Sequence, residues 1–364
     1  MFTKGSKLKF LGLTYILFSA MFLFACGGED EGSPIPGPGT DPDPGPVQPT
    51  VENVVVVYYT SWTPVGSYPD PNKVTHINYS FGHVNASFDG IRIDQDTKLT
   101  ALAGLKSKNS SLKVLLAIGG WGSGGFSEMA RDEAKRKSFA KDCKRVLDQY
   151  NIDGIDLDWE YPTSSGAGIA SHPDDTKNFT LLAKDIREAI GDDNLLTMAS
   201  AGSAAYVDFS SVIKYLDFIN IMGYDYNVVP YHHSALFGGS AISPWMNSSR
   251  AVETHLGKGI PANQLVLGVP FYGRSDMTFS IAYKNIKGNS ALASYTEKWD
   301  DVAKVPYYAD SNGTLVFSFD NETSIKLKCE YALLKKLRGI MCWEFNQDNG
   351  DLAEVIYETI IKKE

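Results

Sequence analysis

The chain has 364 residues and a mass of 39.9 kDa, with 43% hydrophobic and 21% charged residues. This composition excludes a disordered, collagen-like or coiled-coil protein, and the length permits one large domain or two ordinary ones. The formal net charge is −9, and no long basic run occurs outside the N-terminus, which argues against a nucleic acid partner. Four cysteines are too few for a disulfide-built fold. Aromatic residues make up 12% of the chain, and such side chains either fill a core or line a site.

Residues 1–26 are typical of a signal peptide. Lys4, Lys7 and Lys9 precede an apolar run over residues 10–25 that is short for a membrane-spanning helix. The run ends in residues 23–26, Leu-Phe-Ala-Cys, which resemble a bacterial lipobox although Phe24 is bulkier than the usual residue. The resemblance implies that Cys26 is lipidated, and the alternative is an ordinary secretory signal with an incidental cysteine.

Residues 27–50 form an acidic and Pro/Gly-rich linker. The segment Gly-Gly-Glu-Asp-Glu-Gly at 27–32 resembles the surface-export signal of some bacterial lipoproteins. Residues 33–50 contain seven of the 17 prolines, so neither a helix nor a sheet is expected there. A polyproline-like spacer of this length reaches roughly 50 Å at about 3.1 Å per residue. We therefore expect a protein lipid-anchored to the outer membrane of a Gram-negative bacterium and exposed at the cell surface.

From residue 51 to residue 364, short apolar runs alternate with amphipathic segments. The segments 128–149 and 175–190 have the apolar spacing of helices. Eight buried strands that alternate with helices predict a parallel sheet covered on both faces, and about 310 residues favour a (β/α)8 TIM barrel. Residues 275–320, between strand 7 and strand 8, are predicted to form a small inserted α+β lobe. The eight predicted strands are residues 54–59, 74–81, 112–118, 152–159, 195–199, 216–222, 265–269 and 339–343.

The fourth predicted strand carries three acids at alternate positions, Asp156, Asp158 and Glu160. Side chains alternate along a strand, so all three point to one face, about 6–7 Å apart. Like charges this close in a barrel interior raise at least one pKa and keep one acid protonated near neutral pH. Glu160 comes last, at the C-terminal mouth where barrel active sites lie, and is the predicted general acid. The alternative is an acidic strand that faces solvent or binds calcium, but a central barrel strand has no solvent face and calcium ligands come from flexible loops.

Residues 153–162, Asp-Gly-Ile-Asp-Leu-Asp-Trp-Glu-Tyr-Pro, resemble the catalytic signature of glycoside hydrolase family 18, the chitinase family. The resemblance extends from about residue 53 to residue 361. One departure occurs in the third strand, where Ala117 stands at a position usually occupied by serine. The other matching segments are 58–62, 76–81, 117–121, 222–226, 268–274 and 339–344.

The resemblance implies a retaining, substrate-assisted mechanism without a cofactor or a metal. Glu160 would protonate the glycosidic oxygen while the N-acetyl carbonyl of the sugar attacks the anomeric carbon. Asp158 and Tyr224 would hold the acetamido group and stabilise the oxazolinium ion, and Asp156 would exchange a proton with Asp158. Glu160 would then act as base toward water.

The resemblance also implies a set of sugar contacts. Trp343 would form the floor of the subsite before the scissile bond, since an indole covers the apolar face of a sugar ring. For each single aromatic residue the alternative is packing in the core. Trp159 lies between Asp158 and Glu160 on the strand, so its side chain is expected to point away from the cleft. The other implied contacts are Met222, Asp225, Tyr272 and Arg274 around the same sugar, and Trp62, Phe81 and Trp121 along the cleft.

Three weaker patterns have simpler interpretations. Residues 120–125 satisfy GxGxxG, but they follow the third strand, so a loop that needs close backbone approach is preferred over a dinucleotide site. His232 and His233 are interpreted as a loop pair, not a metal site. The remaining cysteines, Cys143, Cys329 and Cys342, are interpreted as buried free thiols, with a Cys329–Cys342 disulfide as the alternative.

The predicted function is hydrolysis of β-1,4 bonds in chitin or N-acetylglucosamine oligosaccharides by a monomeric enzyme. One alternative is an endo-β-N-acetylglucosaminidase that acts on N-glycans with the same acids. An alternative of another class is a non-catalytic, lectin-like glycan-binding lipoprotein, although such relatives typically lack the acid found here at Glu160.

Overall fold

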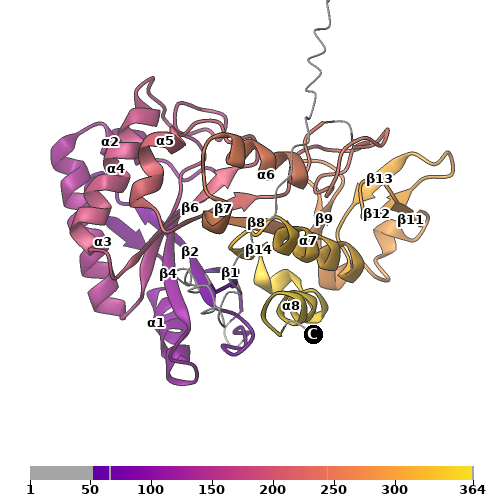
Figure 1. Ribbon diagram of the computed structural model, residues 1–364, viewed down its shortest axis with the longest axis horizontal. Coiled ribbons are helices and arrows are strands. Elements are labelled where there is room, and N and C mark those ends of the chain that lie inside the picture. Colours follow the sequence, from indigo (N-terminus) through magenta and orange to yellow (C-terminus); the bar gives the residue numbers. More distant parts are fainter. Residues whose placement is uncertain (1–51, 65–66, 244, 363–364) are drawn as a thin grey trace, which may run out of the picture. The chain divides into compact units, whose positions relative to one another are not determined.

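The computed structural model describes residues 52–64, 67–243 and 245–362 (Figure 1). The predicted signal peptide, with Cys26, and the predicted linker lie outside the described residues. The described residues belong to one compact unit. No helix of the described residues is both long and apolar enough to cross a membrane.

Eight parallel strands close into a barrel, which confirms the predicted (β/α)8 architecture. The sheet order is β1-β14-β8-β7-β6-β5-β4-β2, and β1 also pairs with β2, so no edge remains between the first and second strands. All eight predicted strands are present with ends shifted by no more than three residues. They are β1 (Val54–Thr60), β2 (His76–Val84), β4 (Lys113–Gly119), β5 (Gly154–Asp158), β6 (Leu195–Ala201), β7 (Phe218–Met222), β8 (Leu265–Pro270) and β14 (Gly339–Trp343). A ninth strand, β3 (Ile91–Ile93), pairs antiparallel with β2.

The strands are buried on both faces, and their side chains separate into two layers. In β1, Val54, Val56 and Tyr58 belong to the small cluster inside the barrel, whereas Val55 and Val57 belong to the large cluster between sheet and helices. This separation follows from the two-residue period of a strand. It explains why strands such as β1, β4, β8 and β14 are almost continuously apolar.

The helices surround the barrel, and α3 and α4 pack side by side (Figure 1). The prediction of a helix over 175–190 is confirmed by α4. The prediction of one helix over 128–149 is wrong, because the segment is divided between α2 and α3. Asp132 adopts an extended conformation and its carboxylate accepts hydrogen bonds from the N–H groups of Ala134 and Lys135, so a new helix begins there. The helices are α1 (Asp96–Gly104), α2 (Phe126–Ala130), α3 (Glu133–Tyr150), α4 (Asp175–Ile190), α5 (Phe209–Val212), α6 (Ser248–Gly257), α7 (Glu322–Leu334) and α8 (Asp351–Tyr357).

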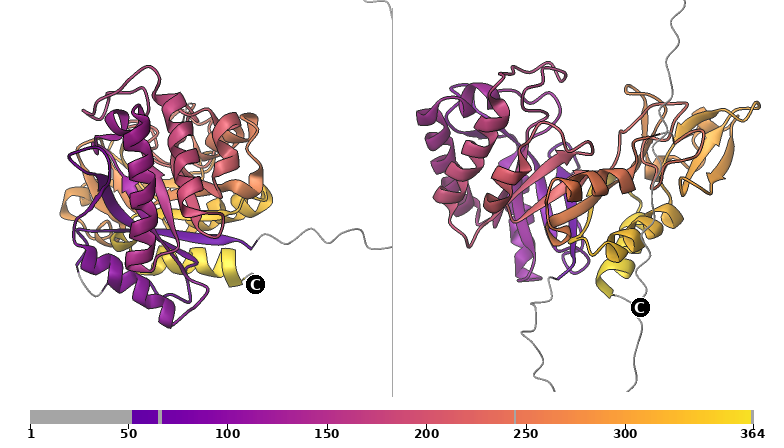
Figure 2. Two further views of the ribbon diagram at one scale, coloured as in Figure 1. Left: turned by 90° about the vertical axis from the view of Figure 1, so that its left-hand side faces the viewer. Right: turned by 45° about the horizontal axis from the view of Figure 1, so that its top comes forward.

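The insertion between β8 and β14 is a lobe built on a five-stranded antiparallel sheet, in the order β10-β9-β13-β12-β11. It differs from the predicted α+β lobe in two respects. Its first strand starts at Tyr272 instead of residue 275, and between 275 and 320 the described helical segments are only short 3-10 turns. Figures 1 and 2 show the lobe (orange) on the side of the barrel away from α3 and α4. Its strands are β9 (Tyr272–Arg274), β10 (Ser280–Ala282), β11 (Thr296–Asp300), β12 (Val305–Ala309) and β13 (Leu315–Ser318).

The three described cysteines, Cys143, Cys329 and Cys342, are buried and free. The interpretation as buried thiols is confirmed, and the alternative Cys329–Cys342 disulfide is not formed.

Candidate active site

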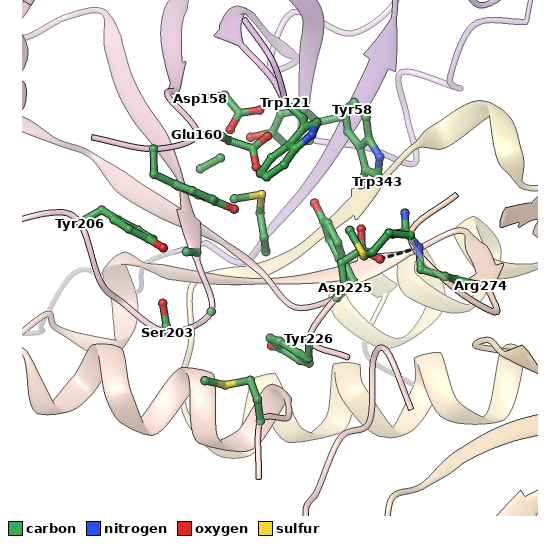
Figure 3. Close-up of a pocket in the computed structure, with 18 of the residues that line it drawn as sticks. Tyr58, Trp121, Asp158, Glu160, Ser203, Tyr206, Asp225, Tyr226, Arg274 and Trp343 are labelled. Atoms are coloured by element: carbon green, nitrogen blue, oxygen red, sulfur yellow. Dashed lines mark hydrogen bonds and ion pairs between the residues drawn. The ribbon is translucent and has the colours of Figure 1, made fainter. Parts of the chain in front are cut away.

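A cavity of about 560 Å³ lies at the C-terminal ends of the barrel strands (Figure 3). Most of the residues predicted to act on the substrate line it, although they come from six different strands and the loops that follow them. Of the predicted residues it is lined by Phe81, Trp121, Asp158, Glu160, Met222, Tyr224, Asp225, Arg274 and Trp343.

Asp156 lies in the barrel interior below the cavity and is fully buried. Tyr58 donates to its Oδ2 at 2.7 Å, and Thr197 donates to its Oδ1 at 2.5 Å. Asn220 also donates to Oδ1, at 3.2 Å. Burial raises the pKa of Asp156, while these hydrogen bonds oppose the rise. The sequence analysis did not single out Tyr58, Thr197 or Asn220, because nothing in a single strand shows which residues face it across a barrel.

Asp158 lies between Asp156 and Glu160, as the strand parity predicted. Burial, followed by the charges of Glu160 and Asp156, raises its pKa well above the usual value. Its Oδ1 is buried and has no hydrogen-bond partner among the described residues. A buried acceptor without a donor costs free energy, so this atom is available to a donor that the substrate brings.

Glu160 lies two residues after the end of β5 and reaches the cavity beside Asp158 (Figure 3). Its pKa is raised to about 7, chiefly by burial, with a further contribution from the charge of Asp225, while a hydrogen bond to Tyr161 opposes the rise. A carboxylic acid with this pKa is suited to protonate a leaving group near neutral pH.

Tyr224 and Asp225 enter the cavity from the end of β7. Burial raises the pKa of Tyr224 well above its usual value, so the hydroxyl stays protonated and can donate a hydrogen bond. Asp225 forms an ion pair with Arg274 (Figure 3), with 3.1 Å between Nε and Oδ1. Tyr272 does not line the cavity: it is buried behind it and hydrogen-bonded to Asp225, so it supports the wall.

Three of the aromatic residues predicted for the cleft, Trp62, Phe81 and Trp343, form one cluster, whereas Trp121 contacts Tyr161. Phe81 stacks on Trp343 at 5.6 Å, and Trp62 meets it edge-on at 6.3 Å. Trp62 and Trp121 are 59% and 64% exposed, which argues against core packing for both. A second cavity of about 530 Å³ is lined by Trp62 and shares Phe81, Trp121 and Trp343 with the first, so the groove continues beyond the acids.

Three comparisons with known proteins agree on one family. The family model described as glycosyl hydrolases family 18 matches residues 54–348. The chain belongs to this family. Chitinase A1 of Niallia circulans is 31% identical over 81% of this chain, and the chain spans 56% of that protein's length. Chitotriosidase-1 of Mus musculus is 32% identical over 81% of this chain and 73% of the length of that protein. A solved family 18 N-acetylglucosaminidase from Paenibacillus barengoltzii superposes with a TM-score of 0.76 at 32% identity, over 85% of this chain and all of that one.

This family 18 chain is thus a glycoside hydrolase, and its cavity contains further residues that the sequence analysis did not assign. Tyr161 and Tyr206 stack at 4.7 Å with 8° between their planes, and Trp121 meets Tyr161 edge-on at 6.3 Å. Trp245 is 59% exposed and lines the same cavity. Tyr206 and Trp245 come from irregular loops, where no periodicity marks a residue for the site.

The close approach at the glycines and the outward position of Trp159 agree with the predictions from the sequence. A Cβ on Gly119 would lie 1.9 Å from the carbonyl oxygen of Asp158, and one on Gly120 would lie 2.7 Å from the ring of Phe81, so these glycines serve close approach. Trp159 points outward and stacks on Phe126 at 5.3 Å. The described residues contain no group of three or more His, Cys, Asp or Glu that could hold a metal ion.

Proposed function

We propose that this hydrolase cuts β-1,4 bonds in chitin or N-acetylglucosamine oligosaccharides by a retaining, substrate-assisted mechanism. The observation that carries the proposal is the unpartnered Oδ1 of Asp158 next to Glu160, whose pKa is about 7. An acetamido N–H is a donor that suits this acceptor, and a protonated Glu160 suits a glycosidic oxygen. The names of relatives, chitinase A1 and chitotriosidase-1, support the same substrate class.

In the proposed mechanism Glu160 acts first as acid and then as base, and Asp158 assists the acetamido group. Glu160 donates its proton to the glycosidic oxygen, and the acetamido oxygen of the sugar bonds to the anomeric carbon as the aglycone leaves. Asp158 accepts the acetamido N–H and stabilises the positive charge of the oxazolinium ion, and the Tyr224 hydroxyl donates to the acetamido group. Glu160 then removes a proton from water. The water oxygen bonds to the anomeric carbon as the bond from that carbon to the acetamido oxygen breaks, which restores the original configuration and frees the acetamido group.

The nucleophile comes from the substrate because the remaining carboxylate of the cavity is otherwise engaged. Asp225 is paired with Arg274 and hydrogen-bonded to His233, and these interactions hold it as a stabilised anion. A carboxylate that is so well satisfied is a poor nucleophile.

The test is digestion of chitotetraose by the wild-type protein and by Glu160→Gln, with products identified by mass spectrometry. We expect shorter N-acetylglucosamine oligomers from the wild type and a loss of turnover of at least about a thousandfold in the variant, as general acid and base are both removed. Binding of chitotetraose to Glu160→Gln, measured by calorimetry, should be retained. Activity retained in that variant would overturn the assignment of Glu160.

The groove favours chitin over the N-glycan alternative. The two adjoining cavities share Phe81, Trp121 and Trp343, so the aromatic lining continues from one cavity into the next, which suits a polymeric substrate. Parallel digests of chitotetraose and of a high-mannose glycoprotein separate the two substrates. Release of the N-glycan with chitotetraose left intact would replace the chitinase proposal by the endo-β-N-acetylglucosaminidase. Binding of both glycans without cleavage would support the lectin-like alternative instead.

We also propose that the protein is a lipid-anchored outer-membrane protein exposed at the cell surface. The support is the sequence alone: the basic and apolar segment before Cys26 and the Pro/Gly-rich linker after it. Cys26→Ser should move the protein from the membrane fraction of the producing cells to a soluble fraction. Proteolysis of intact cells should remove the wild-type catalytic unit, and protection from the protease would contradict surface exposure.

A further inference from the structure

Asp225 combines a left-handed backbone conformation with a carboxylate that has three polar neighbours. Its φ is +55°, in a region that aspartate adopts more often than most residues other than glycine. Its Oδ1 lies 3.3 Å from Nδ1 of His233 and 3.1 Å from Nε of Arg274. Tyr272 hydrogen-bonds to the same carboxylate. The direction in which the carboxylate points is therefore determined by its neighbours.

The contact with Asp225 determines how His233 carries its protons. An ionised carboxylate only accepts hydrogen bonds, so Nδ1 of His233 must be the donor. The side chain is 1% exposed, and its ring lies 5.4 Å from the ring of Tyr272. Its Nε2 is buried without a hydrogen-bond partner among the described residues. Among the described residues, the ring of His233 therefore forms a polar contact only through Nδ1.

The backbone of His233 joins the lobe to the loop that carries Asp225. Its N–H donates to Oγ of Ser318 in β13 at 3.2 Å, and its carbonyl accepts the N–H of Tyr226 at 3.0 Å. The preceding His232 lies 3.3 Å from Ser318 and 3.3 Å from Asp300 of β11. His233 is therefore held on the lobe side while its ring reaches Asp225.

The electrostatic effect of Asp225 extends to the proposed general acid. The charge of Asp225 raises the pKa of Glu160. Burial alone would raise the pKa of Asp225, but the hydrogen bond and charge of His233, with the charge of Arg274, hold it below its usual value. A change at His233 therefore reaches the reaction through Asp225.

We propose that His233 is a positioning residue for the hydrolysis, because its Nδ1–H keeps the Asp225 carboxylate ionised and oriented toward the bound sugar. This inference rests on the proposed function, which gives Asp225 a sugar to contact. His233 itself does not line the cavity.

Two substitutions separate the hydrogen bond from the bulk of the side chain. His233→Asn places an amide N–H two bonds from Cβ, where Nδ1 stands, whereas His233→Leu keeps a similar volume without a donor. We expect His233→Leu to lower kcat on chitotetraose by roughly tenfold or more with KM changed less than about threefold, since the lost contact acts on the reacting sugar. His233→Asn should retain most of the activity. Equal losses of kcat in the two variants would overturn the proposal.

The pH profile adds a readout that a purely structural role would not move. The groups that face Asp225 are His233 from the loop after β7, Arg274 and Tyr272 from β9, and Glu160 from the end of β5. Without the His233 donor, the acidic limb of kcat/KM should move to higher pH by roughly half a unit or more in His233→Leu and stay near the wild-type position in His233→Asn. An unmoved limb in His233→Leu would contradict the proposal.

His255→Leu is the control for loss of a buried imidazole. His255 is fully buried on α6 and hydrogen-bonded to Ser200 and to the carbonyl of Ala251. This variant should lower Tm as His233→Leu does, but it should leave the acidic limb in place. If the acidic limb of kcat/KM moves equally in His233→Leu and His255→Leu, the shift results from destabilisation of the fold, and the proposal is overturned.

A spectroscopic test does not depend on activity. In protein labelled with 15N-histidine, the signals of the His233 ring nitrogens are identified because they are missing from the spectrum of His233→Asn. Long-range 15N–1H correlations then show which of the two nitrogens carries a proton. We expect a protonated Nδ1. A neutral ring protonated only at Nε2 would overturn the inference even if chitotetraose is cleaved. A wild-type protein that cleaves no N-acetylglucosamine substrate would overturn the proposed function while the Nδ1–H contact stands.

Discussion

At the scale of single residues, the site depends on acids whose pKa values are raised by burial. Asp156 is 0% and Asp158 is 5% exposed; Asp158 and Glu160 line the cavity, whereas Asp156 lies below it. Removing a carboxylate from water penalises the charged form, and neighbouring carboxylates increase the penalty. At least one of these acids therefore carries a proton near neutral pH, as a general acid catalyst requires.

The pH dependence of the reaction should show this proton. Glu160 must be protonated to act on the glycosidic oxygen, and its pKa is raised to about 7. We expect kcat/KM on chitotetraose to fall above about pH 7, approaching tenfold per pH unit, because the acid form is lost as pH rises. The measurement is a series of initial rates from pH 4 to pH 10. A profile that stays flat to pH 9 would contradict the role of Glu160.

At the scale of secondary-structure elements, the loops at the strand ends create the site and the helices support the barrel from outside. Trp121, Tyr206 and Trp245 follow three different strands, yet they line the same cavity. The lobe adds Arg274 to that wall through β9. The outer helices contribute no residue to the cavity lining, so changes in them should affect stability and leave catalysis unaltered.

The N-cap of α3 offers a test of this division. Asp132 accepts hydrogen bonds from Ala134 and Lys135 at 2.9 and 3.1 Å. Asp132→Ala should cost about 1 kcal/mol of stability, or roughly 2 °C in Tm for a domain of this size, with kcat and KM unchanged. Asp132→Asn keeps the accepting oxygen and should lose much less. Thermal denaturation followed by circular dichroism measures both, and a change in kcat for Asp132→Ala would contradict the division.

At the scale of the whole molecule, the active-site acids reduce the stability of the fold. The folded-state pKa of Glu160 is about 7, above its ordinary value of 4.5, so the folded chain binds more protons than the unfolded chain between these values. Stability therefore decreases as pH rises from about 4.5 to 7. The structure tolerates this cost because the rest of the barrel is closed and densely apolar.

Glu160→Gln should remove that cost. Glutamine has no charge to desolvate, so the variant should be more stable than the wild type above pH 7, by at most about 3 kcal/mol at 1.4 kcal/mol per pKa unit. The difference should disappear below about pH 4.5, where the wild-type acid is protonated in both states. Urea denaturation at pH 8 and at pH 4 measures it. A variant no more stable than the wild type at pH 8 would show that Glu160 is not destabilised by its site.

Much of the fold and of the catalytic strand could be predicted because both depend on local patterns. Eight apolar runs predicted the strands, and the two-residue period placed Asp156, Asp158 and Glu160 on one face. The division of α2 from α3 was missed because the cap at Asp132 lies inside a continuous amphipathic pattern. The lobe was placed correctly between β8 and β14, but its strands pair with partners distant in sequence, which local composition does not reveal.

By itself, the sequence determined the barrel, the order of the acids along β5 and the family resemblance, because alternation along a strand and a contiguous motif are properties of neighbouring residues. Only the tertiary structure decided which groups surround those acids: Tyr58, Thr197 and Asn220 around Asp156, and Arg274 and His233 around Asp225. It also showed that Tyr272, expected as a sugar contact from the family resemblance, does not line the cavity. The physical reason is that pKa values and side-chain directions depend on burial and on contacts across the barrel, and these exist only once the sheet has closed.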